Sequence, residues 1–348
     1  MNSKTELLCI GNAIVDVFIN IDPVLAAKFG ITRPVQHIGR EQASLILNEV
    51  SAAGTVKSSG GGAANAAKIA AMLGINTVFS GCAGRDEFAE ILKEDLSAAG
   101  VSAILPTSNE MTGVCFICNV EGEMRFTAYP GAALDLTEND IGEELISGAD
   151  AVILDGYILE RRSLVQHILR LASGRGIPVA LDTASVFQVK SKAEEILHYS
   201  RNFPMFIFMN TDEALAFYNT IRKSCDEEAC LSDKEKEKII LRDVCPMLKI
   251  ITDGEIFPIA VVKMGSRGAV VMAGGNMYLE ETFAVMPRNT VGAGDGFLAA
   301  FLAAWIRGKS LSSCAALGNK VARKILDVPG SRIEKSSLKP YAKILKNG

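Results

Sequence analysis

An aspartate directly after a run of very small residues is the strongest chemical signal in the sequence. Asp295 follows Gly292–Gly294, and Phe297, Phe301 and Trp305 then recur at the spacing of one helix face. A helix that begins among glycines leaves unpaired N–H groups pointing outward, and its dipole adds partial positive charge at that end. The turn therefore suits an anionic phosphoryl group. Asp295 is expected either to cap the helix or to take the proton from an attacking hydroxyl.

Two common nucleotide-binding patterns do not fit this turn. A P-loop needs Gly-x-x-x-x-Gly-Lys-Ser/Thr, which the sequence lacks. A dinucleotide fingerprint needs a third Gly or Ala after Gly292 and Gly294, but Phe297 occupies that place. A dinucleotide-dependent dehydrogenase is therefore disfavoured.

Two other places combine polar residues with apolar strands. Asn210 and Glu213 follow the run "MFIFM" and lie three apart, so they share a helix face at the carboxyl edge of the expected sheet. Glu213 could orient hydrated magnesium through water, or Asn210 could simply cap the helix. Asp16 stands in an otherwise apolar strand. It could point outward by alternation, or bind vicinal hydroxyls together with Asn65.

Apolar runs alternate with helical patterns along most of the chain. Several short strands are apolar throughout, as expected of strands covered on both faces. The alternation predicts an α/β fold with a mainly parallel sheet and helices on both sides. Residues 14–56 and 107–129 lack crossover helices, and they are expected to pair in space as a small β lid. Residues 1–13, 57–106 and 130–348 are expected to form the large domain.

Composition limits the classes of function. The 348-residue chain has 49% hydrophobic and 22% charged residues, as ordinary folded proteins do. Its net charge of −4 predicts no general attraction to nucleic acid or to an anionic membrane. With no signal peptide or long apolar span recognised, a cytoplasmic location with reduced thiols is expected.

Cys115 and Cys118 would face opposite sides of a strand, which disfavours a shared metal. The charge-dense segment 222–239 is expected to be a solvated helix or loop.

Several motifs, in order along the chain, resemble those of the ribokinase (PfkB carbohydrate kinase) family. "NTVGAGD" resembles the family's C-terminal signature, and "SGGGAANAAKIAAMLG" resembles its N-terminal glycine signature. "GNAIVDVF", "NTDEA" and "VVKMGSRGA" resemble its substrate-hydroxyl, magnesium–phosphate and nucleotide motifs. The N-terminal layout, with a helix in "DPVLAAKFG" between the first two lid strands, is closest to that of adenosine kinases. The resemblance implies a ribokinase-like three-layer α/β/α sandwich with a small β-sheet lid.

The resemblance also implies roles for individual residues. Asp295 would take the proton of a primary hydroxyl, while the amides of Gly292, Ala293 and Gly294 stabilise charge on the transferred phosphoryl. ATP and Mg²⁺ are the implied cofactors, with a monovalent cation as a further candidate. The implied substrate-binding residues are Asn12, Asp16, Gln36, Ile38, Gly61, Gly62, Asn65, Arg125 and Tyr157, with His37 also on the lid. The implied nucleotide-binding residues are Asn210, Glu213, Lys263, Gly265, Gly268 and Asn319, with Glu213 on the metal through water.

Some of these positions have simpler explanations. Turn chemistry explains Asn12 equally well, Arg125 could be a surface arginine, and Tyr157 could be ordinary packing rather than a stacking platform for a purine. The sequence also departs from the family pattern at two positions. Asn289 replaces the first acid of the C-terminal signature, near the metal–phosphate shell. Lys263 stands where threonine is common, and it could contact phosphate or extend to solvent.

The sequence thus predicts an ATP-dependent kinase that phosphorylates a primary hydroxyl, with adenosine-like ribonucleosides favoured. A free-sugar kinase for ribose, fructose or a related keto-sugar is the alternative. A non-catalytic nucleoside or nucleotide sensor, suggested by Asn289, is a third hypothesis. An aromatic-lined pocket would favour the nucleoside, and a small all-polar pocket the sugar. A monomer or weak dimer is expected, with no nucleic-acid or membrane partner.

Overall fold

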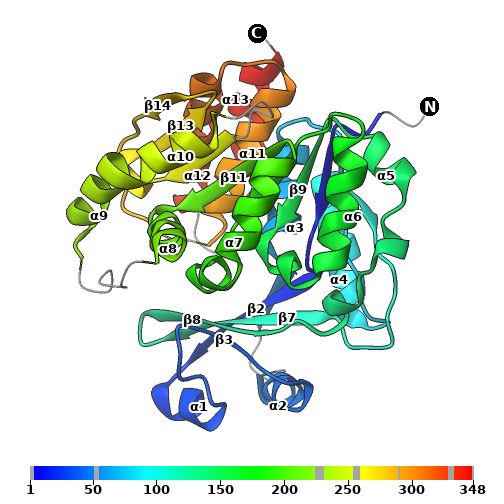
Figure 1. Cartoon of the computed structure of the whole chain (residues 1–348). Coiled ribbons are helices and arrows are strands. Elements are labelled where there is room, and N and C mark those ends of the chain that lie inside the picture. Colours follow the sequence, from blue (N-terminus) through cyan, green and yellow to red (C-terminus); the bar gives the residue numbers. More distant parts are fainter. Residues whose placement is uncertain are drawn as a thin grey trace.

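A large sheet crosses the middle of the molecule, with helices on both faces (Figure 1). The computed structural model describes residues 4–50, 55–223, 231–253, 259–288, 291–327 and 333–346. Within these residues the sheet has nine strands in the order β14-β13-β12-β11-β10-β9-β1-β5-β6. It is parallel from β12 to β6, and β13 and β14 join it antiparallel. The strands are β1 Leu7–Ile10, β5 Thr77–Ser80, β6 Ser102–Ile104, β9 Ala151–Asp155, β10 Val179–Asp182, β11 Met205–Asn210, β12 Ile259–Lys263, β13 Ala269–Ala273 and β14 Asn276–Glu280.

Two separate hydrophobic clusters pack the helices against the sheet, one on each face. The seven strands from β13 to β5 are largely buried on both sides, which explains why they read as continuous apolar runs, whereas the edge strands β6 and β14 are mostly exposed. One face carries α3 Gly62–Met72, α4 Glu87–Ala99, α11 Ala293–Ile306, α12 Leu311–Leu326 and α13 Lys335–Lys346. The other carries α5 Glu143–Ser147, α6 Arg162–Ser173, α7 Val186–Asn202, α8 Thr211–Arg222 and α10 Cys245–Ile251. The predicted three-layer α/β/α arrangement is confirmed.

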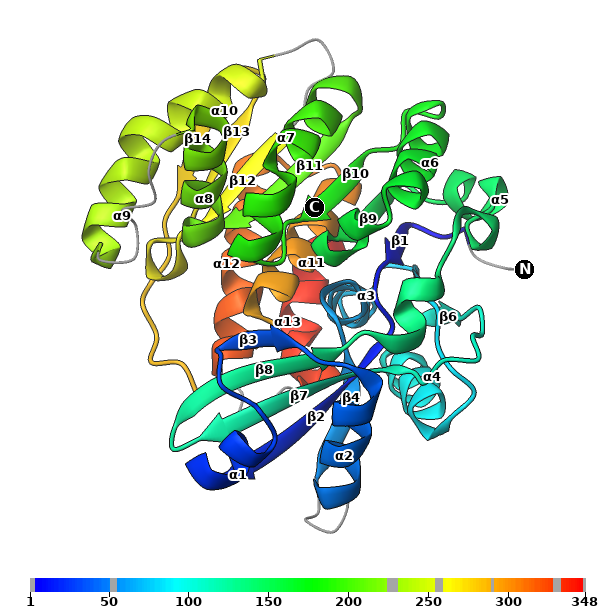
Figure 2. The same ribbon diagram turned by 60° about the horizontal axis from the view of Figure 1, so that its bottom comes forward.

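A second, smaller sheet lies at one end of the large one (Figure 2). Its order is β3-β8-β7-β2-β4, and α1 Pro23–Lys28 and α2 Arg40–Val50 lie on the side away from the large domain (Figure 1). The helix expected between the first two lid strands is α1, which Asp22 caps by accepting the N–H of Leu25 at 2.7 Å. The strands are β2 Ile14–Ile21, β3 Val35–His37, β4 Val56–Gly60, β7 Gly113–Val120 and β8 Glu123–Tyr129.

The small sheet joins the two predicted lid segments, because β2 pairs in parallel with β7 over eight residues. Strand β4 also pairs with β2 as far as Gly60, so this sheet continues past residue 56, where the lid was predicted to end. The division of the chain into two domains stays a prediction. Part of the charge-dense segment is the short helix α9 Asp233–Ile239, while residues 224–230 lie outside the described part.

Short irregular turns complete the description. They are the 3₁₀ segments Gly131–Asp135, Glu138–Asp140, Gly156–Glu160 and Gly265–Arg267, and a π-helical turn at Ile240–Val244.

Among the described helices, none has the length and apolar character that crossing a bilayer requires. Cys115 is partly exposed and Cys118 is buried, and both thiols are free. The described residues contain no group of three or more His, Cys, Asp or Glu side chains that could hold a metal on their own.

Candidate active site

Aromatic packing fixes the helix that carries Asp295. The rings of Phe297 and Phe301 contact Phe208 of β11, with centroids 6.4 and 5.2 Å apart. Trp305, farther along α11, packs edge-on against Phe206 of the same strand. The predicted stripe therefore lies against the sheet. The helix begins after Gly292, whose φ of +81° is a conformation that glycine adopts without strain.

The Asp295 carboxylate points from the first turn of α11 toward α3. Its Oδ2 accepts a hydrogen bond from Nδ2 of Asn65, at 3.0 Å. Gly292 is the N-cap residue, so among the described contacts Asp295 bonds a neighbouring helix and does not cap its own. Burial raises the pKa of Asp295 to about 7, and the charge of Asp182 adds to the rise, while Asn65 and Lys263 oppose it. A carboxyl with this pKa can take up a proton near neutral pH.

A cavity of about 330 Å³ lies between the large sheet and the small sheet. Two buried carboxylates, Asp16 and Asp155, reach it from β2 and from the end of β9. Burial raises the pKa of Asp16 to about 7, although the positive charge of Lys68 lowers it in part. The cavity is lined by Asn12, Ile14, Asp16, Val35, His37, Gly61, Gly62, Cys115, Phe126, Ala128, Pro130, Asp155, Tyr157, Ala184 and Ser185.

The glycines before α3 let this cavity come close to Asp295. Gly61 has a φ of +86°, and a Cβ there would lie 2.6 Å from the carbonyl oxygen of Asn12. A Cβ on Gly62 would lie 3.3 Å from Oδ1 of Asp295 and 3.6 Å from Oδ2 of Asp155. The backbone of Gly62, which lines the cavity, thus lies beside the candidate base. A hydroxyl bound against Gly62 would be close to the Asp295 carboxylate.

Strand alternation decides which residues of β3 face the cavity. Val35 and His37 line it. The side chain of Gln36 points the other way, and its Nε2 donates to the carbonyl of Gly30 at 2.8 Å. Ile38 packs against the hydrophobic cluster and does not line the cavity. The structure therefore brings His37 to the site, and it places Gln36 and Ile38 outside it.

Of three further predicted substrate residues, two line the cavity and one lies outside it. Tyr157 lines the cavity, with its ring edge-on to His37 at 5.9 Å between centroids. Asn12 also lines it, and its Oδ1 accepts a hydrogen bond from Arg161 at 2.7 Å. Arg125 lies outside the cavity, because its guanidinium donates to the carbonyl of Ile31 at 2.8 Å.

A second cavity, of about 440 Å³, lies on the other side of the Gly292–Gly294 turn. It brings together all the predicted nucleotide residues except Glu213, and Ala293 and Gly294 form part of its wall. Asn319, from α12, donates its side-chain amide to the carbonyl of Glu280 at 3.0 Å. The lining is Asn210, Lys263, Gly265, Ser266, Gly268, Thr282, Phe283, Val285, Pro287, Ala293, Gly294, Phe297, Asn319, Ala322, Arg323 and Leu326. This mixture of apolar side chains with glycines suits a flat base and its phosphates.

Glu213 forms a capping box with Asn210 at the start of α8. Its Oε2 accepts from the backbone N–H of Asn210 at 2.8 Å and from the hydroxyl of Thr183 at 2.9 Å. Its Oε1 accepts from Nδ2 of Asn210 at 2.8 Å. The capping interpretation therefore describes this geometry. Burial and the neighbouring charge of Asp182 raise the pKa of Glu213.

Two acids that sequence reasoning missed stand beside the predicted ones. Asp155 is the last residue of β9 and Asp182 is the last residue of β10. Asp182 accepts a hydrogen bond from the ammonium of Lys263 at 2.7 Å. Burial and the charge of Asp182 raise the pKa of Asp155. Both acids end apolar parallel strands, and the rule that ligands collect at the carboxyl edge of such a sheet could have found them.

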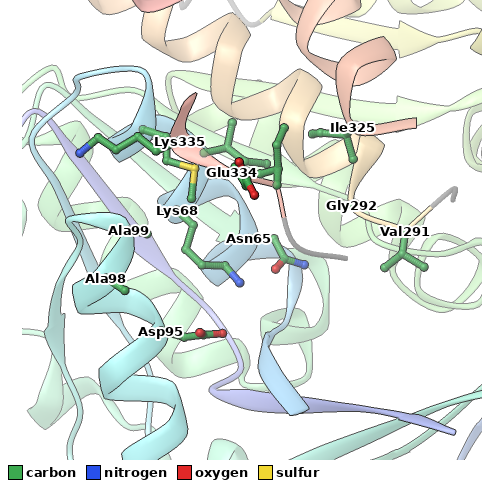
Figure 3. Close-up of a pocket in the computed structure, with 13 residues that line it drawn as sticks. Asn65, Lys68, Asp95, Ala98, Ala99, Val291, Gly292, Ile325, Glu334 and Lys335 are labelled. Carbon is green, nitrogen blue, oxygen red and sulfur yellow. The ribbon is translucent and has the colours of Figure 1, made fainter. Parts of the chain in front are cut away.

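A third cavity, of about 360 Å³, lies on the α3 side of the same turn (Figure 3). Asn65 and Lys68 reach it from α3, and Asp95 from α4. Asn65 thus lines this cavity and bonds Asp295, whereas it was expected beside Asp16. Gly292 forms part of the wall. Asn289 lies outside the described residues.

Comparison with known proteins identifies the family of the chain. Residues 25–337 match the description "pfkB family carbohydrate kinase". The chain is 26% identical over 340 residues to adenosine kinase of Schizophyllum commune, covering 92% of this chain and 94% of that protein. It is 26% identical over 270 residues to ribokinase of Bacillus subtilis, covering 76% and 79%. The crystal structure of adenosine kinase from Sinorhizobium meliloti superposes with a TM-score of 0.81 at 24% identity, covering 98% and 100%, a likeness of fold alone.

Proposed function

The chain belongs to the PfkB carbohydrate kinase family, whose members are phosphotransferases with an alcohol acceptor, and we propose that its acceptor is an adenosine-like ribonucleoside. Use of ATP follows from the family. In the proposed reaction the primary hydroxyl oxygen of the nucleoside bonds to the γ-phosphorus of ATP. The bond from that phosphorus to the β–γ bridging oxygen breaks, and ADP leaves. Asp295 takes the proton of the hydroxyl.

The observation that carries the proposal is the position of Asp295 between two cavities. On one side, Gly62 of the first cavity approaches Oδ1 of Asp295. On the other, Ala293 and Gly294 line the second cavity and begin the helix that carries Asp295. A base at such a boundary can reach an acceptor hydroxyl in one cavity and an entering phosphoryl from the other. The backbone amides at the start of α11 would stabilise charge on that phosphoryl.

The lining of the first cavity suits a nucleoside. Asp16 and Asp155 offer carboxylate oxygens that can accept bonds from sugar hydroxyls, and both are buried. In the same cavity, His37, Phe126 and Tyr157 supply aromatic walls that suit a planar base. The volume of about 330 Å³ lies at the lower end of the range for small-molecule pockets. Aromatic walls over paired carboxylates favour a nucleoside.

Magnesium fits the chemistry of the side chains between the cavities. Together with burial, the charge of Asp182 raises the pKa of Asp155, Glu213 and Asp295, and the charge of Lys263 lowers the pKa of Glu213 and Asp295. Mg²⁺ usually keeps several waters and is held by one or two carboxylates together with the phosphates of the nucleotide. Glu213 is the residue that would hold it, through water. When bound, Mg²⁺ would neutralise charge on the phosphates.

The lengths of the matches also favour a nucleoside. The match to the Schizophyllum commune adenosine kinase covers 92% of the chain, whereas the match to the Bacillus subtilis ribokinase covers 76%. The relatives are too distant to fix the acceptor by identity alone. Free sugars remain the second candidate, because Asp155 adds a second buried carboxylate for hydroxyl groups.

A substrate panel tests the proposal. ADP release from ATP and Mg²⁺ is measured with adenosine, other ribonucleosides, 5′-deoxyadenosine, ribose and fructose. We expect adenosine-like ribonucleosides to give the highest kcat/KM, and 5′-deoxyadenosine to give none because it lacks the acceptor hydroxyl. Release with a sugar and with no nucleoside would reverse the ranking. Binding of a nucleoside without release would instead support a sensor.

A further inference from the structure

Lys263 occupies the junction between the base, the anion-binding turn and the nucleotide cavity. It is the last residue of β12, and its ammonium donates to Oδ2 of Asp182 at 2.7 Å. Both side chains are nearly enclosed, with 14% of Lys263 and 15% of Asp182 exposed. An enclosed ammonium loses its hydration, so its position must be stabilised by groups of opposite charge.

The ammonium faces the turn at which the transferred group is expected. A Cβ on Gly294 would lie 3.2 Å from Nζ of Lys263, so the ammonium packs against the backbone of the proposed anion hole. Lys263 and Gly294 both line the nucleotide cavity. An ammonium has three N–H donors. Among the described residues, Asp182 is the one acceptor that bonds Nζ, which leaves donors for a ligand.

Lys263 lies among several carboxylates, and its charge can act on an entering phosphoryl group as well as on Asp182. Burial lowers the pKa of Lys263, but the charges of Asp182, Glu213 and Asp295 together raise it above its usual value, so the ammonium stays protonated. A phosphoryl group entering among these acids would meet net negative charge. A fixed ammonium beside the turn reduces that repulsion where charge develops during transfer.

We propose that Lys263 is a catalytic residue that keeps its bond to Asp182 and donates its remaining N–H groups to the terminal phosphoryl of ATP. The lysine stays protonated throughout and contributes charge only, since Asp295 receives the acceptor's proton. This inference rests on the proposed use of the second cavity for ATP. It adds a side-chain cation to the main-chain anion hole.

A purely structural role for Lys263 would be to neutralise Asp182. The two roles are separated by the pair of variants Lys263→Met and Asp182→Asn/Lys263→Met. The single variant leaves Asp182 buried without its partner, while the double variant removes both charges together. If neutralisation were the whole role, the double variant would recover. If Lys263 contacts the phosphoryl, both variants stay impaired.

Nucleotide binding gives a readout that needs no acceptor. Affinities for MgATP and MgADP are measured by titration calorimetry on the full chain and its variants. We expect both variants to bind MgATP at least tenfold more weakly, since a charge-assisted hydrogen bond is worth about 1.5–3 kcal/mol, with MgADP changed less than twofold. Lys263→Arg, which keeps the charge, should retain most of the preference for ATP. Lys236→Met is the matched control, because Lys236 pairs with an aspartate, Asp212, at 2.8 Å on α8, away from both cavities.

The outcomes separate this inference from the proposed function. Equal losses of MgATP and MgADP affinity, or recovery in the double variant, would overturn the role of Lys263. With the best acceptor of the substrate panel, kcat should fall about 10²–10³-fold in both variants. A wild-type chain that binds MgATP but phosphorylates none of the acceptors would refute the proposed function, and the binding comparison would still decide the role of Lys263.

Discussion

Replacing Asp16 by asparagine should stabilise the folded protein at alkaline pH while impairing acceptor binding. Asp16 is 6% exposed, and none of the described residues donates a hydrogen bond to its carboxylate. Burial raises its pKa to about 7, which means that the folded chain disfavours the ionised form. Asparagine has nearly the same shape and carries no charge, so Asp16→Asn removes the cost of burying the anion.

The size of the effect follows from linkage between proton binding and folding. A pKa raised from 3.8 to about 7 corresponds to about 4 kcal/mol, since a tenfold change in proton affinity is worth about 1.4 kcal/mol. The folded-state pKa is the higher one, so stability is complete below pH 4 and declines as the pH rises to about 7. Above pH 7 the full penalty applies. Asp16→Asn should therefore gain up to about 4 kcal/mol at pH 8.5 and almost nothing at pH 4.

The assay is urea unfolding of wild type and Asp16→Asn at pH 4 and pH 8.5. Asp22→Asn is the control, because Asp22 is an exposed N-cap at which asparagine is an equally good cap, and it should change stability little at either pH. At pH 8, Asp16→Asn should also raise KM for the acceptor about 10–100-fold through the loss of charge-assisted hydrogen bonds. Lower stability of Asp16→Asn at pH 8.5 would refute the reasoning, since it would mean that the ionised carboxylate is well solvated or paired.

Three further predictions concern the catalytic turn and its support. Asp295→Asn should lower kcat about 10²–10⁴-fold, and in the wild type kcat/KM should rise with pH through about 7, because the base must be ionised and burial raises its pKa to about 7. Steady-state kinetics between pH 5 and 9 would measure both. Gly292→Ala should cost about 1–2 kcal/mol in urea unfolding and lower kcat, because its φ of +81° strains a residue with a Cβ. Phe301→Ala should cost about 3–5 kcal/mol in the same assay, because this fully buried ring packs against Phe208.

Each of these predictions has a result that contradicts it. An Asp295→Asn enzyme with near wild-type kcat would exclude Asp295 as the base, and a flat pH profile would argue against its raised pKa. Unchanged activity and stability in Gly292→Ala would mean that the turn tolerates a side chain. Leu279→Ala is the control for Phe301→Ala, because it lies on the edge strand β14 with 43% exposure and should cost little. Equal losses in the two variants would mean that packing on β11 does not hold α11 in place.

The chemistry-bearing turn and the sheet could be predicted because both depend on local pattern. The stripe of Phe297, Phe301 and Trp305 predicts a helix face, and the structure packs that face on β11. Continuous apolar runs predicted strands covered on both sides, and the structure has one hydrophobic cluster on each face of the sheet. The gathering of Lys263, Gly265 and Gly268 in one cavity was expected from the motif that contains all three.

The direction of single side chains could not be predicted in the same way. Gln36 and Ile38 were expected over the substrate, but the register of β3 turns Val35 and His37 toward the cavity instead. A shift of one residue along a strand exchanges its faces, and short polar strands carry no pattern that fixes the register. Asn65 was expected beside Asp16, but the close approach of α3 and α11 places it on Asp295.

The sequence by itself determined the succession of strands and helices along the chain and the glycine turn before Asp295. It also determined the class of chemistry that such a turn supports. All of these depend on residues close together in the chain. Only the tertiary structure decided the environment of the charges. The pairing of Lys263 with Asp182, and the burial that raises the pKa of Asp16 and Asp295 to about 7, join residues far apart in sequence. Electrostatic energies depend on distance and on the exclusion of water, and both are fixed only when the sheets and helices have packed together.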